Sequence, residues 1–146
     1  MLVLKRLGFV MTALVMILIV LMYKGDLPAS EVDAKYANKH SRFLDVASGA
    51  RIHYRDEGNP LGLPLVLVHG SNASLHTWEP WVQRLGNEFR VITLDLPGHG
   101  LTGRVVGDDY SSVAFVEAIN AVVEHLGVSG FALGGNSMGG GATWRY

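Results

Sequence analysis

A serine flanked by glycines, in the segment Gly135-Asn136-Ser137-Met138-Gly139, constrains the fold more than any other feature of this chain. An apolar run over 131–134 precedes it, and small residues follow it. In this pattern a strand enters a sharp turn and a helix leaves it, and the glycines remove side chains that would clash. We therefore expect Ser137 to lie exposed at a helix N-terminus. The alternative is a turn in which Ser137 only caps the helix.

The remaining apolar patterns predict strands that alternate with helices. Two short alternating segments come first and predict a hairpin with one solvated face. Strands that then alternate with helices predict an α/β fold, a mostly parallel sheet with helices on both faces. Either Ser111 or Ser112 is expected to cap the helix that Gly127 ends. The expected strands cover 42–46, 51–55, 65–68, 89–94 and 131–134, and the expected helices cover 75–85, 111–126 and the segment from residue 138 onward.

Three of the expected strands end in polar or glycine-rich segments. These segments are 69–72, 95–100 and 136–138. Ligands of such sheets bind outside the carboxyl ends of the strands, so we expect the three segments to form one site. In that site Ser137 would be a nucleophile, and the backbone N–H of Met138 would face the oxyanion of a tetrahedral intermediate.

The other polar residues at these strand ends are expected to brace loops. His69 could be a catalytic base, but it directly precedes Gly70, where the loop turns, so a loop-bracing hydrogen bond is the favoured interpretation. Asp95 could be a triad acid, but with His99 it is expected to fix the turn between them. The segment Asn72-Ala73-Ser74 matches a glycosylation pattern that we interpret as chance.

Three motifs follow one another along the chain. They are Leu67-Val68-His69-Gly70, Asp95-Leu96-Pro97-Gly98-His99-Gly100 and Gly135-Asn136-Ser137-Met138-Gly139-Gly140. Together they resemble the α/β-hydrolase fold superfamily, and most of all its membrane-anchored esterase- or lipase-like members. The resemblance implies a serine hydrolase of small-molecule ester or acyl substrates that needs no cofactor. It also implies that the N–H of Ser71, or alternatively that of Asn72, is the second oxyanion donor.

One departure from the family pattern is decisive for the expected activity. In the family the triad acid and histidine follow the nucleophile along the sequence. Residues 138–146 contain neither. We therefore expect residues 42–146 to be the N-terminal part of a hydrolase domain, with the first five strands, whose triad acid and histidine lie beyond Tyr146. The alternative is an inactive binding or scaffold module of the same fold.

The N-terminal segment predicts a membrane anchor. Lys5 and Arg6 precede an apolar run over 7–23, which as a helix is roughly 25 Å long, at the lower edge of what spans a bilayer. Lys24 closes the run. The basic flank predicts that the start stays cytoplasmic and that the hydrolase part is exported. A cleaved signal peptide and a buried core helix are the alternatives. The expected organisation is an anchor over 1–24, a tether or short helix over 25–41, and the hydrolase part over 42–146.

Composition and charge argue against several kinds of chemistry and partner. The chain has no cysteine, which excludes disulfides and thiolate chemistry within it. Its net charge is −1, so no nucleic-acid partner is expected. The histidines do not pair with carboxylates at metal-ligand spacing, so no metal is expected. The oligomeric state is not predicted.

Overall fold

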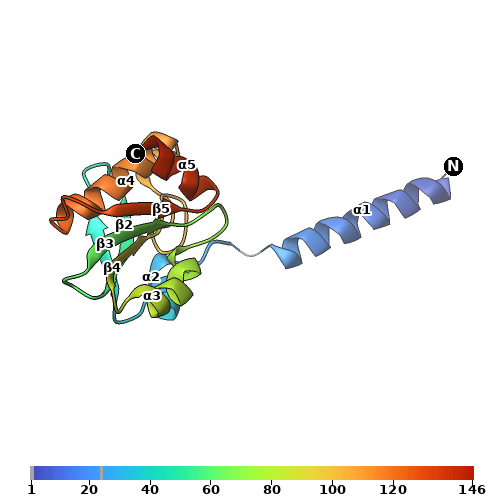
Figure 1. Ribbon diagram of the computed structural model, residues 1–146. Coiled ribbons are helices and arrows are strands. Elements are labelled where there is room, and N and C mark those ends of the chain that lie inside the picture. Colours follow the sequence, from blue (N-terminus) through green and yellow to red (C-terminus); the bar gives the residue numbers. More distant parts are fainter. Residues whose placement is uncertain (1, 24) are drawn as a thin grey trace.

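The computed structural model describes residues 2–23 and 25–146, so Met1 and Lys24, which fall in the predicted anchor, lie outside the described residues. Its sheet and helices appear in Figure 1. The strands are β1 (Ser41–Asp45), β2 (Arg51–Gly58), β3 (Leu63–Val68), β4 (Phe89–Leu94) and β5 (Ala132–Gly135). The helices are α1 (Leu2–Met22), α2 (Ala29–Tyr36), α3 (Glu79–Leu85), α4 (Ser112–His125) and α5 (Met138–Arg145), with 3-10 turns η1 (Leu75–Trp78) and η2 (Val106–Asp108).

The five strands form one mixed sheet in the order β1-β2-β4-β3-β5. β3 pairs in parallel with β4 and with β5, whereas β2 pairs antiparallel with β1 and with β4. β2 therefore runs against the other four strands, and the sheet is mixed. The parallel pairing predicted for the strands that alternate with helices is confirmed for β3, β4 and β5, and the antiparallel pairs are those of β2 in the predicted hairpin.

Helices cover both faces of the sheet, as predicted. α4 and α5 lie on one face, and η1 with α3 lies on the other (Figure 1). The larger core lies under α4, where Ile119 and Val122 pack with Val66, Val68 and Ile92. A smaller core forms under α3 around Trp78, Leu67 and Val91.

The hairpin does not have the solvated face that its alternation predicts. Ile52 and Tyr54 of β2 join the larger core, while His53 and Arg55, on the opposite face, are 0% and 2% exposed. The cause is the place of β2 inside the sheet, between β1 and β4, where both of its faces are covered. The prediction of one solvated face is therefore wrong.

The segment predicted as one helix over 75–85 consists of η1 followed by α3. Pro80 lies in the first turn of α3, where its missing N–H costs no intrahelical hydrogen bond. Trp78 is buried, but Trp81 is 53% exposed. Trp81 therefore does not belong to the buried face of this segment.

α4 begins as one of the two sequence alternatives predicts. The Ser111 hydroxyl accepts a hydrogen bond from the Ala114 amide at 3.2 Å and is the N-cap. Gly127 follows the helix with φ 64°, a left-handed conformation that suits glycine after a helix end.

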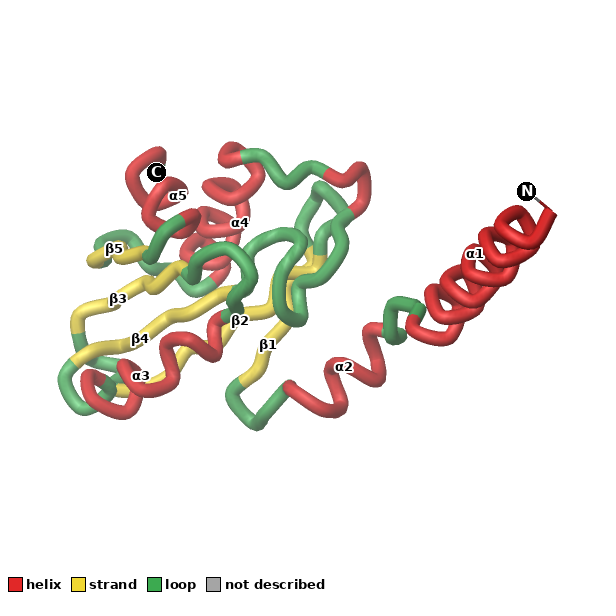
Figure 2. Tube along the Cα trace, turned by 90° about the vertical axis from the view of Figure 1, so that its right-hand side faces the viewer, coloured by secondary structure: helices red, strands yellow, loops and turns green. Residues whose placement is uncertain are grey.

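The N-terminal helix α1 lies apart from the sheet, and α2 lies between α1 and β1 (Figure 2). Residues Lys5–Met22 are long and apolar enough to cross a membrane, judged by length and composition alone, and none of this span is buried. A signal sequence near an N-terminus passes the same test. Within the predicted tether, residues 29–36 form α2.

Candidate active site

Ser137 occupies a backbone conformation that a serine rarely adopts. Its φ is 52° and its ψ is −117°, between the end of β5 and the start of α5. Positive φ in a residue other than glycine is strained and gathers at functional sites. The residue is exposed and makes no side-chain capping hydrogen bond, so the geometry does not support the alternative in which Ser137 caps the helix.

The two flanking glycines are required by the close approach of backbone segments. A Cβ added to Gly135 would lie 2.4 Å from the carbonyl oxygen of Gly139. A Cβ added to Gly139 would lie 2.3 Å from the Val68 carbonyl oxygen and 2.4 Å from that of His69. Both distances are far below van der Waals contact. The first turn of α5 therefore packs directly on the backbone at the end of β3.

The loop after β3 lies against the serine turn. The Asn136 amide donates to the Val68 carbonyl oxygen at 3.1 Å. A Cβ on Gly70 would come within 3.2 Å of the Ser137 Cβ, so this glycine allows the loop to approach the nucleophile. Among residues 2–23 and 25–146, the amides of Ser71 and Met138 donate to no protein acceptor. These two N–H groups are thus free to bind an anionic oxygen.

Asn72, the alternative donor, follows Ser71 in the same loop. Its φ is 54°, a left-handed conformation that asparagine tolerates better than most residues. Both Ser71 and Asn72 are exposed. The structure therefore brings together, at one edge of the sheet, the serine and the loop expected to supply the second oxyanion donor.

His69 uses both ring nitrogens to hold loops. It is fully buried, its Nε2 accepts from the Leu96 amide at 3.0 Å, and its Nδ1 donates to the Gly70 carbonyl oxygen at 2.7 Å. Burial lowers the pKa of His69 and outweighs the opposing effects of that carbonyl and of Asp95. The ring is therefore neutral, connects the loops after β3 and β4, and has no nitrogen left to take a proton from Ser137.

Asp95 joins three parts of this edge through its carboxylate. Oδ2 accepts from the His53 Nδ1 at 2.7 Å and from the Leu101 amide at 2.8 Å, and Oδ1 accepts from the Leu75 amide at 2.7 Å. Burial alone would raise the pKa of Asp95, but these hydrogen bonds together outweigh burial and lower it. The carboxylate is ionised and wholly engaged in holding the loops.

His99 lies beside His69 in the turn after β4. Its Nδ1 donates to the Pro97 carbonyl oxygen at 3.1 Å, and its ring centroid is 5.2 Å from that of His69. The contacts of His69, Asp95 and His99 are thus those of residues that brace loops.

Two polar residues of this network were not predicted from the sequence. His53 of β2 donates to Asp95, and its Nε2 lies 2.8 Å from the Ser41 hydroxyl. Thr102 connects the same residues, because its hydroxyl donates to the Asp95 carbonyl oxygen at 2.7 Å and accepts from the His53 amide at 2.9 Å. The one sequence feature that could have pointed to this hydrogen-bond network is the polar side chain of His53 in the middle of a strand.

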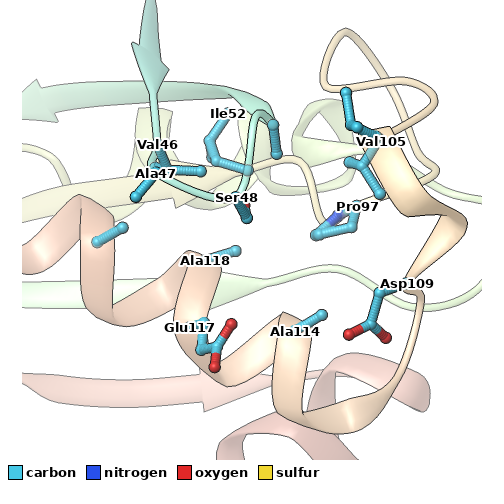
Figure 3. A pocket seen from close by; sticks show the side chains of 13 residues that line it. Val46, Ala47, Ser48, Ile52, Pro97, Val105, Asp109, Ala114, Glu117 and Ala118 are labelled. Atoms are coloured by element: carbon cyan, nitrogen blue, oxygen red, sulfur yellow. The ribbon is translucent and has the colours of Figure 1, made fainter.

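A further cavity lies between the hairpin turn and α4, where Pro97 and Val106 of the segment after β4 also line it (Figure 3). Its volume is about 260 Å³. Alanines 47, 114 and 118 line it, and the carboxylates of Asp109 and Glu117 lie at its border. Ser71, Ser137 and Met138 do not line it.

Comparisons with known proteins agree with this geometry. A family model described as the alpha/beta hydrolase fold matches residues 64–146. The protein is 32% identical over 139 residues to the dihydrolipoyllysine-residue acetyltransferase component of the acetoin cleaving system of Pseudomonas putida, covering 84% of this chain and 37% of that protein. It is 31% identical over 99 residues to (E)-2-((N-methylformamido)methylene)succinate hydrolase of Acinetobacter baylyi, covering 68% of this chain and 36% of that protein.

A solved structure shows the same arrangement of elements. A carboxylesterase of the thaumarchaeon Nitrososphaera gargenis is similar with a TM-score of 0.68 and 28% identity, over 72% of this chain and 39% of that chain. The present chain spans little more than a third of the length of each of these three proteins.

Proposed function

The chain belongs to the α/β-hydrolase fold family, and from this premise we propose that it supplies the nucleophile of a hydrolase of ester or related acyl bonds. The observation that carries the proposal is the conformation of Ser137. This serine lies between a strand and a helix, has φ 52° and is exposed. The glycines on either side of it have no room for a Cβ, and the whole arrangement fits a nucleophile turn.

The amides of Ser71 and Met138 support an oxyanion hole beside Ser137, with Asn72 as the alternative donor. Two preorganised N–H groups stabilise the negative charge that develops on the carbonyl oxygen, at no reorganisation cost when the reaction occurs. In the proposed reaction the Ser137 Oγ bonds to the acyl carbon and the alcohol leaves with the serine proton. Water then hydrolyses the acyl-enzyme to the carboxylic acid.

A general base must take the serine proton, and the two fully buried histidines near the site are engaged elsewhere. His69 and His53 each use both ring nitrogens in contacts of 3.0 Å or less. Residues 138–146 contain no acid and no histidine. We therefore assign the triad acid and histidine to residues that follow Tyr146, in the order that the family fold implies.

The identity of the nucleophile separates this proposal from other reactions of the fold. An aspartate at position 137 would indicate dehalogenase or epoxide hydrolase chemistry, in which a carboxylate attacks the substrate. The serine instead favours transfer of an acyl group. An inactive binding module of the same fold is the second candidate, and replacement of the nucleophile separates the two.

Ser137→Ala tests the proposal directly. In the full-length protein this change should lower turnover of a short-chain p-nitrophenyl ester on the order of 10³-fold or more and abolish labelling by a fluorophosphonate. Ser129→Ala, at an exposed serine before β5, is the matched control and should keep both the turnover and the labelling of the wild-type protein. Activity that survives Ser137→Ala would remove Ser137 from the mechanism. A folded wild-type protein with neither labelling nor turnover would favour the binding module.

We also propose that α1 anchors the protein in a membrane with the hydrolase part on the exported side. The support is the exposed apolar surface of Lys5–Met22, which no other described part of the protein covers, and the basic residues Lys5 and Arg6 at its start.

A further inference from the structure

We propose that the candidate active site faces the membrane surface, and that its substrate is therefore an ester whose acyl chain is embedded in the bilayer. This inference rests on the proposed hydrolase activity and on the proposed anchoring by α1, and it adds the class of substrate. Three observations carry it: the contacts of α2, the number of residues between α1 and α2, and the apolar side chains exposed at the same edge.

The first observation is that α2 lies beside the loops that form the site. Val32 and Tyr36 of α2 border a cavity whose other lining residues come from the loops after β3 and β4. Those are the loops that carry the expected oxyanion donor and the turn held by Asp95. The other lining residues are Ser74, His76, Gly100 and Leu101.

An ion pair ties α2 to this same edge. The Arg51 Nη2 donates to the Asp33 Oδ2 at 2.8 Å, and both side chains are partly shielded from solvent. Arg51 begins β2 next to the hairpin turn and lies beyond the point where Tyr54 pairs with Leu94, the last residue of β4. The pair therefore holds α2 at the carboxyl edge of the parallel strands, where Ser137 lies.

The second observation is the shortness of the segment between α1 and α2. α1 ends at Met22 and α2 begins at Ala29, and the connection between them reaches at most about 25 Å when fully extended. A compact body of about 100 residues has a radius of gyration of about 13 Å and is therefore about 35 Å across. The connection is too short to lead around such a body. The edge to which α2 is tied must therefore face the membrane in which α1 lies.

The third observation is that this edge exposes apolar side chains. Leu27 in the connection, Val106 in η2 and Tyr110 after η2 are all exposed, and Val106 is the most exposed of them at 74%. Tyrosine is enriched at the level of lipid headgroups, where its ring is buried and its hydroxyl stays wet. Arg104 and Arg51, which both lie at this edge, are paired with Asp108 and Asp33, each at 2.8 Å. The described arginines of the edge are thus neutralised, which fits an uncharged lipid surface.

A depth measurement tests the orientation without any need for activity. Residues 1–146 contain no cysteine, so any cysteine beyond residue 146 would be replaced by serine and single cysteines labelled with an environment-sensitive dye. The full-length protein would be reconstituted in phosphatidylcholine vesicles that contain a doxyl-labelled lipid quencher. Val106→Cys reports the site edge, and Leu61→Cys, 94% exposed in the turn between β2 and β3, is the matched control at the opposite edge.

We expect the dye at 106 to lose most of its fluorescence and the dye at 61 to keep it. Insertion of a Gly/Ser spacer of about 30 residues between Gly25 and Asp26, with a root-mean-square reach of about 30 Å, should abolish the difference. Equal quenching at both positions in the protein without the spacer would overturn the orientation.

The substrate class has its own readout. The same spacer should lower kcat/KM for a long-chain ester embedded in the vesicles about tenfold and leave kcat/KM for a soluble short-chain ester unchanged, because the reacting serine itself is untouched. Equal values for the embedded ester with and without the spacer would overturn the proposed substrate class. Absence of any Ser137-dependent hydrolysis would refute the proposed activity, while the quenching result would still decide the orientation.

Discussion

The glycines that flank Ser137 differ from Gly141, farther along α5, in what a side chain would meet. A Cβ at Gly139 would overlap the backbone at the end of β3, whereas a Cβ at Gly141 would meet nothing within 4 Å. We predict that Gly139→Ala lowers the free energy of unfolding by about 1–3 kcal/mol, because backbone must shift to relieve the overlap. Gly141→Ala is the matched control and should stabilise the helix by about 0.5–1 kcal/mol. Denaturant unfolding of the full-length variants measures both, and equal effects would contradict the close packing of Gly139 on β3.

His69 makes the stability of the site edge depend on pH. Burial lowers its pKa below the usual 6.5, so between the folded and unfolded values the unfolded protein binds more protons. The contribution of His69 to stability is therefore complete above about pH 6.5 and is lost as the pH falls through the lowered folded value. We predict that the free energy of unfolding decreases below about pH 6.5, and that His69→Gln reduces this slope. A slope unchanged in His69→Gln would assign the effect to another group.

At the scale of single residues, the sequence predicts the local geometry within one motif better than the contacts between residues far apart in the chain. The spacing of Gly135, Ser137 and Gly139 predicts the turn because all its geometry is local. The hydrogen bond between His53 and Asp95 depends on β2 lying next to β4, which joins residues far apart in the sequence. No local pattern carries that information, so the interpretation missed the pair.

At the scale of elements, α4 offers a direct test of its N-cap. Ser111 accepts a hydrogen bond from Ala114, while Ser112 is the first residue of the helix. We predict that Ser111→Ala lowers the free energy of unfolding by about 1 kcal/mol, because one amide of the first turn loses its acceptor. Ser112→Ala is the control and should change stability by less than about 0.5 kcal/mol. The same loss in both variants would contradict the cap seen in the structure.

The period of apolar residues predicts where strands and helices lie but not what covers them. The five predicted strands overlap β1 to β5, because buried strands leave apolar runs between turn residues. The pattern could not show that β2 is an interior strand with an antiparallel neighbour on each side. The buried Arg55, which donates to Glu79 at 2.8 Å and to His76 at 3.0 Å, belongs to that interior position and not to a solvated face.

At the scale of the whole molecule, the anchor has a simple biochemical test. We predict that the full-length protein stays in the membrane fraction after carbonate washing, because α1 would bury its apolar side chains in the bilayer. A variant that begins at Gly25 is the control and should be released. Wild-type protein in the supernatant, or a mature N-terminus near Ser30, would favour a cleaved signal peptide.

The outermost strand of the described sheet predicts how residues 25–146 behave alone. β5 pairs only with β3 in this sheet, so its other edge presents unpaired backbone N–H and C=O groups. Such an edge recruits strands from other molecules, and β5 has only small residues after Leu133 to oppose this. α5 has 8 residues, and a helix this short is not stable without packing partners on its exposed side.

We therefore predict that residues 25–146, expressed alone, aggregate and hydrolyse no ester above background. Without a base, Ser137 remains a neutral hydroxyl and a weak nucleophile. An oxyanion hole alone retains some rate over water in proteases that have lost triad residues, but it does so in a rigid fold. Light scattering, amide hydrogen exchange and ester hydrolysis measure the three properties together. A soluble monomer that unfolds cooperatively and loses its turnover with Ser137→Ala would contradict the prediction, because the base would then have to come from within residues 25–146.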